Sequence, residues 1–130
     1  MKGKSNLISW ACAIIAAFIM LQTLYFKFSG AAESIFIFSS MGIEPWGRWL
    51  SGIMELIASI LILIPSKRGT GAVLGGGIMA GAILSHLIVL GIEVQDDGGQ
   101  LFIYAMVTFT ACIINVWLHR RQIPIIGNLI

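Results

Sequence analysis

The stretch that decides the fold is Ser51-Gly-Ile-Met-Glu-Leu-Ile-Ala-Ser-Ile-Leu-Ile-Leu-Ile-Pro65, an apolar run that contains one carboxylate, Glu55. A carboxylate at the centre of a membrane helix costs roughly 2.5–3.5 kcal/mol on insertion scales, whereas each Leu or Ile returns about 0.3–0.6 kcal/mol. The nine Leu and Ile residues between Leu50 and Ile64 together offset that cost. We therefore expect the run from Trp46 to Pro65 to span a bilayer with an acid inside it.

The rest of the chain has the composition of a membrane protein. Of its 130 residues, 58% are hydrophobic and only 11% are charged, whereas a soluble domain carries about 25% charged residues. Three further runs, 5–26, 69–92 and 98–119, contain no Asp, Glu, Lys or Arg, and each is long enough to cross the hydrocarbon core. The sequence predicts an all-α, integral membrane four-helix bundle that forms one domain over residues 1–130. The expected helices are about 7–27, 46–64, 70–92 and 100–119.

The basic residues predict how this bundle is oriented. Six of the eight basic residues flank the first helix, the second turn and the last helix: Lys2, Lys4, Lys67, Arg68, Arg120 and Arg121. The other two connections hold only Lys27 and Arg48. The positive-inside rule therefore places both termini in the cytoplasm. The formal charge of +2 reflects this bias, and because no basic patch is interleaved with aromatic residues, we expect no nucleic-acid partner.

The first connection, residues 29–45, differs from the other two, which are short turns at 65–69 and 96–99. Its Ile35-Phe-Ile-Phe38 segment is too short to span a bilayer but too apolar for open water. We expect this segment to lie at the membrane interface or to fold back as a lid, with Ser34 as a candidate cap of a short helix.

Glycines predict close packing of the third helix. Gly71 and Gly75 form one G-x-x-x-G pair, and Gly77 and Gly81 form another. Small residues let membrane helices approach closely. We expect both pairs to form tight seams within the bundle, and dimerisation through them stays open.

Polar side chains on all four helices are predicted to share one layer. With a rise of about 1.5 Å per residue, they lie roughly 6–14 Å from the outer boundary. They are Gln22, Glu55, His86, Tyr104 and Thr108. One face of the second helix adds Arg48, Ser51, Gly52 and Ser59. The inner half offers only Asn115. This layer predicts a polar-lined cavity that faces outward, and the candidate ligand-binding residues are Glu55, His86, Lys27, Gln22, Arg48 and Tyr104.

Glu55 is the centre of this hypothesis. Burial disfavours the charged form of a carboxyl group unless a cation lies beside it, and the candidate cations are Lys27, Arg48 and protonated His86. A Glu55–His86 pair could hold or pass a proton. The alternative is structural, with Glu55 bonded to His86 or Ser85 and pinning the bundle.

The sequence does not favour a metal centre or a thiol redox centre. The spacing of His86, Glu93, Asp96 and Asp97 matches no established metal motif. Cys12 and Cys112 have no C-x-x-C partner, so we expect buried thiols and no disulfide. No motif for a nucleotide is present, which predicts no intrinsic cofactor.

Four segments occur in an order that resembles one family: Lys27-Phe-Ser-Gly30, Met41-Gly-Ile-Glu-Pro45, Gly52-Ile-Met-Glu-Leu56 and Asp97-Gly-Gly-Gln-Leu-Phe102. From about residue 14 to residue 117 the chain is similar to the DoxX-like family of small four-helix membrane proteins. The resemblance implies the cytoplasmic (inner) membrane of a bacterium, a basic and an acidic residue at Lys27 and Glu55, and for some members a redox-linked complex with a quinone.

These observations lead to three hypotheses about function. The first is a binding or accessory subunit whose cavity holds an apolar ligand, a quinone or lipid, or packs a helix of a membrane protein partner or of a second copy. The second is a proton-coupled small-molecule transporter, although small multidrug exporters place their acid on the first helix. The third is a membrane enzyme that uses Glu55 and His86 as acid and base.

Overall fold

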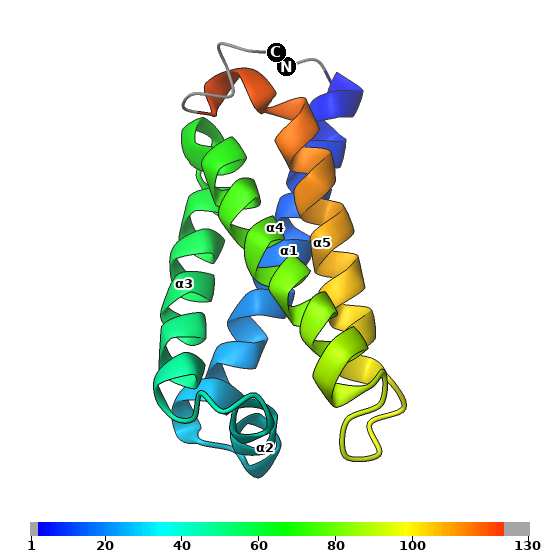
Figure 1. The fold of residues 1–130 in the computed structure, drawn as a ribbon. Coiled ribbons are helices and arrows are strands. Elements are labelled where there is room, and N and C mark those ends of the chain that lie inside the picture. Colours follow the sequence, from blue (N-terminus) through cyan, green and yellow to red (C-terminus); the bar gives the residue numbers. More distant parts are fainter. Residues whose placement is uncertain (1–2, 124–130) are drawn as a thin grey trace.

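The computed structural model describes residues 3–123, and Lys2, which contributed to the predicted orientation, lies outside them. Its α-helices are α1 (Gly3–Ser29), α2 (Ala32–Ser40), α3 (Trp46–Leu63), α4 (Arg68–Ser85) and α5 (Gln100–Leu118). Short 3-10 turns, η1 (Pro65–Lys67) and η3 (Arg120–Gln122), follow α3 and α5, and a π-helical turn, η2 (His86–Leu90), extends α4. The predicted all-helical bundle is confirmed (Figure 1).

Four of these helical segments are long and apolar enough to cross a membrane: Gly3–Ser29, Trp46–Leu63, Pro65–Leu90 and Gln100–Leu118. The chain is a multi-pass membrane protein. The start of α1 and the end of α5 lie together, and we call this the terminal end of the bundle (Figure 1). The opposite end carries α2 and the connection between η2 and α5, and we call it the α2 end. The side of the membrane on which each end lies stays a prediction.

Small side chains fill the core where the helices meet. α1 packs against α3 and α5, and α4 packs against the same two helices. Seven alanines are buried there: Ala13, Ala16, Ala17, Ala58, Ala72, Ala105 and Ala111. Large apolar side chains point outward instead, with Phe18 70% and Ile88 77% exposed. This inverted distribution suits a bundle whose outer surface is solvated by lipid, because burying apolar side chains gives no advantage there.

One of the two predicted glycine seams is present. A Cβ atom at Gly71 would overlap the backbone of Leu61 and Ile62, and one at Gly75 would lie 3.0 Å from Cys112 Sγ. A Cβ atom at Gly77 or Gly81 would meet nothing within 4 Å. The prediction of a seam at the second pair is therefore wrong, because α4 has moved away from its neighbours at that level.

This difference can be tested with two matched substitutions on α4. We expect Gly71→Ala to destabilise the bundle by about 1–3 kcal/mol, because backbone atoms cannot yield to the new methyl group. Gly77→Ala should leave stability unchanged or raise it by up to about 1 kcal/mol through helix propensity. Reversible unfolding in bicelles measures both. Equal losses in the two variants would contradict the assigned seam.

The predicted third helix, 70–92, is divided in the structure. α4 ends at Ser85, and the π-helical turn η2 carries the chain to Leu90. The N–H of Gly91 donates to the carbonyl of His86 at 2.7 Å, and Gly91 ends the turn with a φ of +80°. A glycine adopts this left-handed conformation without steric cost, so the uncharged run continues for two residues, Gly91 and Ile92, beyond the helical structure.

α2 lies at the end of the bundle, as expected for the apolar segment of the first connection. Its Ser34 and Phe38 are buried, whereas Ile35 and Phe36 are 38% and 43% exposed. Ser34 does not cap the helix, because α2 already begins after Ala31.

The connection between η2 and α5 is held by one carboxylate. Asp97 Oδ1 accepts from the N–H groups of Val94 at 3.0 Å and Gly99 at 2.8 Å, and Oδ2 accepts from that of Leu101 at 3.2 Å. Burial raises the pKa of Asp97, but these three donors and the nearby His86 outweigh it, so the pKa is lowered overall. Because the folded value lies below the ordinary one, Asp97 stabilises the fold above the ordinary Asp pKa and loses this contribution as pH falls through the folded value.

Asp97→Asn should therefore loosen this connection at neutral pH. It removes a charged acceptor of three hydrogen bonds, and we expect a loss of about 1–2 kcal/mol. Hydrogen exchange of the Val94, Gly99 and Leu101 amides is the measurement. Asp96→Asn is the control, because Asn tolerates the φ of +62° at this exposed position. Unchanged exchange in Asp97→Asn would show that the carboxylate does not hold the connection.

Candidate ligand-binding cavity

The α2 end of the bundle contains a cavity of about 720 Å³. It arises because α4 and α5 diverge from α1 and α3 toward this end (Figure 1). Side chains of α1, α2, α3, α4 and α5 all line it. The bundle is therefore hollow in the half where the sequence predicts a polar layer.

Five of the six predicted ligand-binding residues line this cavity: Gln22, Lys27, Glu55, His86 and Tyr104. Arg48 does not. Its Nε donates to both carboxylate oxygens of Glu44, at 2.6 and 3.1 Å, and its guanidinium donates to the backbone carbonyl of Lys27. Arg48 is buried, and it joins the start of α3 to the end of α1. Its role here is structural.

An ion pair between Lys27 Nζ and Glu55 Oε1 lies at the wall of the cavity. Thr23 Oγ1 donates to Glu55 Oε2 at 2.7 Å, and Lys27 Nζ donates to Ser51 Oγ at 2.9 Å. Thr23 and Lys27 are one turn apart on α1, as Ser51 and Glu55 are on α3, so two i, i+4 pairs face each other. The Glu55 side chain is 3% exposed and that of Lys27 is 14% exposed. The carboxylate is thus satisfied at both oxygens.

The predicted Glu55–His86 and Glu55–Ser85 contacts are wrong. His86 Nδ1 donates to the carbonyl of Gly91 at 2.9 Å, and Ser85 Oγ donates to that of Gly81 at 2.8 Å. Glu55 faces α1, because α3 stays packed on α1 where α4 diverges. Sequence reasoning missed Thr23, although its spacing of four residues from Lys27 was a usable signal.

The opposite wall is formed by η2, α4 and α5. The His86 ring meets Phe102 edge to face, with centroids 5.5 Å apart. The Tyr104 hydroxyl accepts from Gln100 Nε2 at 2.8 Å. Thr108 is fully buried and lies outside the lining, and its Oγ1 has no hydrogen-bond partner among residues 3–123. Much of the remaining lining is apolar, including Met20, Ile78, Met79 and Ala105.

The cavity is only partly enclosed. Some of its lining residues are also exposed on the outer surface of the bundle. Trp46, Leu50, Gly77 and Gly81 on α3 and α4, and Phe26 and Gln100 on α1 and α5, are such residues.

A second polar cluster occupies the terminal end, where sequence analysis found only Asn115. Arg68, 1% exposed, donates from Nε to the carbonyl of Ile62 at 2.7 Å and from Nη1 to Ser9 Oγ at 3.0 Å. Ser9 Oγ donates to Asn115 Oδ1 at 2.9 Å. Asn115 returns a bond from Nδ2 to the Ser9 carbonyl at 3.2 Å. The cluster therefore ties all four spans together.

Arg68 was expected in the turn at 65–69, but it is the first residue of α4 and is buried. Its guanidinium stacks on the Trp10 ring, 3.9 Å from the ring centroid. His119 Nε2 lies 2.8 Å from Ser9 Oγ, and burial together with the charge of Arg68 lowers the pKa of His119. A cation already sits in this cluster, so a second one is disfavoured.

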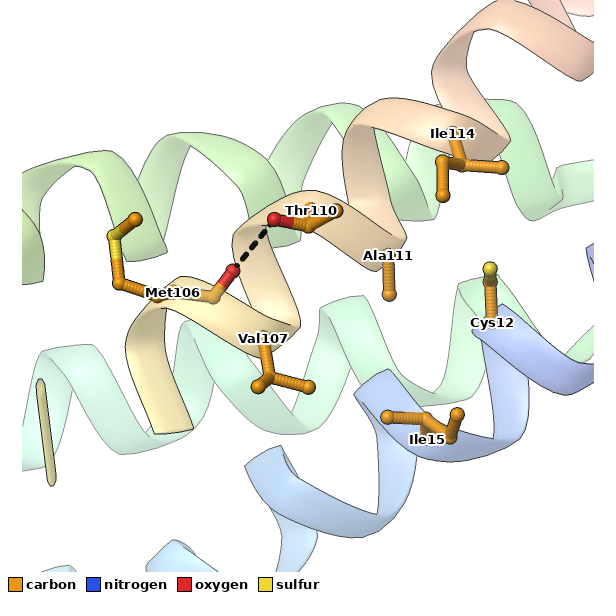
Figure 2. Close-up of a pocket in the computed structure, with 7 residues that line it drawn as sticks. All are labelled: Cys12, Ile15, Met106, Val107, Thr110, Ala111 and Ile114. Atoms are coloured by element: carbon orange, nitrogen blue, oxygen red, sulfur yellow. Dashed lines mark hydrogen bonds between the residues drawn. The ribbon is translucent and has the colours of Figure 1, made fainter. Parts of the chain in front are cut away.

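A shallow apolar groove of about 330 Å³ lies between α1 and α5 (Figure 2). Cys12 and Ile15 face Val107 and Ala111 across it. The one hydroxyl there, Thr110 Oγ1, already donates to the carbonyl of Met106 at 2.9 Å. Cys12 and Cys112 are both free thiols; Cys112 is buried as expected, whereas Cys12 is only partly buried. Within the described part of the chain, no group of three or more His, Cys, Asp and Glu side chains could hold a metal.

No protein-family model matches the chain, and neither a curated protein nor a solved structure is significantly similar to it. The resemblance to the DoxX-like family stays a prediction.

The ion pair at the cavity wall can be tested by a double-mutant cycle. Lys27→Met leaves a buried carboxylate without its cation, and we expect a loss of about 3–5 kcal/mol in the free energy of unfolding. Adding Glu55→Gln should restore part of it, because the stranded charge disappears. Lys67→Met, at an exposed position, is the control and should change stability by no more than about 0.5 kcal/mol. A double variant no more stable than Lys27→Met would argue against a direct pair.

Proposed function

We propose that this chain is a membrane-embedded binding or accessory subunit whose cavity holds the polar head of an apolar ligand, a lipid or a quinone. The observation that carries the proposal is the cavity of about 720 Å³ at membrane depth, with the Lys27–Glu55 pair on its wall. Ligand cavities are typically about 300–1,000 Å³, mostly apolar, with a few polar groups placed for orientation. This cavity has those properties, and its partly exposed lining would let a ligand enter from the bilayer.

The hydrogen bonds support binding more than acid–base catalysis. Glu55 uses its two oxygens for Lys27 and Thr23, whereas His86 is anchored separately on Gly91. A general base must lie within hydrogen-bond reach of the proton that it removes, and Glu55 is engaged on both sides. The same engagement argues against Glu55 as a free proton carrier in a transporter.

The cellular setting is part of the proposal. The excess of basic residues at the terminal end supports a cytoplasmic location for that end, and therefore a cavity that opens in the outer half of the membrane. The resemblance to the DoxX-like family supports a bacterial inner membrane and a redox-linked complex. A partner helix or a second copy of the chain would cover the exposed lining residues of the cavity. It would then compete with a small ligand.

The proposal is tested by placing a large side chain at a glycine that lines the cavity. Gly81→Phe places a ring at an open position, so we expect the bundle to fold but to exclude its ligand. The protein is extracted with its surrounding lipid by a polymer, and bound molecules are identified by mass spectrometry against the bulk membrane extract.

The wild-type protein should retain at least one amphiphile enriched over the bulk extract, and Gly81→Phe should lose it. Val73→Phe, on an exposed position of the same helix outside the cavity, is the control and should retain it. An extract from wild-type protein that matches the bulk membrane, or enrichment that survives Gly81→Phe, would contradict the proposal.

A further inference from the structure

We propose that the ligand of this cavity is an electrically neutral amphiphile with a hydroxyl head group, and that His86 accepts the hydrogen bond from this hydroxyl. The inference rests on the proposed binding function and narrows its ligand to a lipid alcohol or a quinol, because the carbonyl groups of an oxidised quinone only accept hydrogen bonds. It depends on four observations about the cavity wall, taken in turn below.

The first observation is the tautomer of His86. Its Nδ1 lies 2.9 Å from the carbonyl oxygen of Gly91. A carbonyl oxygen can only accept a hydrogen bond, so Nδ1 must carry the proton. In the neutral imidazole, Nε2 then carries a lone pair and can only accept. The π-helical turn fixes this arrangement, because the N–H of Gly91 is itself bonded to the carbonyl of His86.

The second observation is that Nε2 is open to the cavity. His86 is only 5% exposed, yet it lines the cavity. Nδ1 is the ring atom that bonds to the protein. Among residues 3–123, the side-chain nitrogen and oxygen atoms that are both fully enclosed and without a hydrogen bond are Arg68 Nη2 and Thr108 Oγ1. Nε2 of His86 is not among these enclosed atoms, so a molecule in the cavity can reach it. Nε2 is therefore a preorganised acceptor with free space beside it.

The third observation is a donor on the opposite wall. An ammonium group has three N–H donors. Lys27 Nζ directs two of them to Glu55 Oε1 and Ser51 Oγ, and the Phe38 ring lies 5.8 Å away. A ligand group that both donates and accepts therefore matches this cavity. A hydroxyl does both, whereas an ether or a ketone only accepts and an ammonium only donates.

The fourth observation concerns charge. The Lys27–Glu55 pair is neutral as a unit, so it attracts neither an anionic nor a cationic head group strongly. Glu33 also lines the cavity. Burial, followed by the charge of Asp97, raises the pKa of Glu33, so a negative charge is disfavoured on this side of the cavity. A phosphate head group would meet further repulsion there. A neutral head group is the one that this wall accommodates.

The experiment uses two photoreactive probes that differ in one hydrogen-bond donor. One is a cetyl alcohol with a diazirine in its tail, and the other is the methyl ether of the same molecule. Wild-type protein in lipid nanodiscs is irradiated with each probe, and labelled cavity peptides are quantified by mass spectrometry. We expect the alcohol to label about three- to tenfold more than the ether, the range of one neutral hydrogen bond.

Two substitutions then separate the two nitrogens of His86. His86→Asn keeps an N–H donor near the position of Nδ1 for Gly91 but removes the acceptor at Nε2, so the preference for the alcohol should disappear. His86→Gln places an amide oxygen near the position of Nε2 and should restore part of the preference. Thr110→Val, a change of an exposed residue of α5 outside this cavity, is the control and should keep the wild-type preference.

The outcomes separate the proposed binding function from the proposed preference for a hydroxyl group. If neither probe labels the cavity of wild-type protein, the proposed binding function fails together with this inference. If both probes label it equally, the binding function stands and the hydroxyl preference is refuted. If the preference persists in His86→Asn, His86 is not the acceptor.

Discussion

The ion pair between Lys27 and Glu55 is the interaction on which the rest of this structure depends. A lone carboxylate inside a bilayer is costly, and α3 can carry one because α1 presents a cation and a hydroxyl at the same level. The pair fastens α1 to α3 in the half of the bundle where α4 and α5 diverge. The Lys27–Ser51 hydrogen bond and the bond from Arg48 to the carbonyl of Lys27 join the same two helices. The ion pair therefore helps to hold one wall of the cavity together.

The two ends of the bundle accommodate buried polar side chains in different ways. All six acidic residues lie between Glu33 and Asp97, in or near the α2 half, where ionic pairs form. At the terminal end, Arg68 is buried without an acidic partner among the described residues, and hydrogen bonds and the face of Trp10 accommodate it. Hydrogen bonds from neutral groups spread a charge without cancelling it. The α2 end contains the cavity. At the terminal end, the buried polar cluster joins all four spans.

Much of this was predictable from the sequence, and the rest failed for identifiable physical reasons. Hydropathy predicted the four spans, and helical spacing predicted that Glu55 faces inward. Periodicity cannot show which neighbour a side chain meets, so Lys27, Arg48 and His86 were all candidate partners of Glu55, and the structure pairs it with Lys27. Arg68 was assigned to a turn because it lies between Pro65 and Gly69, but α4 begins at that residue and Arg68 is buried. Gly77 and Gly81 have the same spacing as Gly71 and Gly75, yet only helix divergence decides which pair makes contact.

The central claim is that Glu55 is an ionised carboxylate held by Lys27 within the membrane. An infrared difference spectrum between wild-type protein and Glu55→Gln, recorded in lipid at neutral pH, tests it most directly. The account predicts that wild-type protein shows the carboxylate bands of Glu55 and that these bands shift in Lys27→Met. A protonated carboxyl band for Glu55 that is unchanged by Lys27→Met would contradict it.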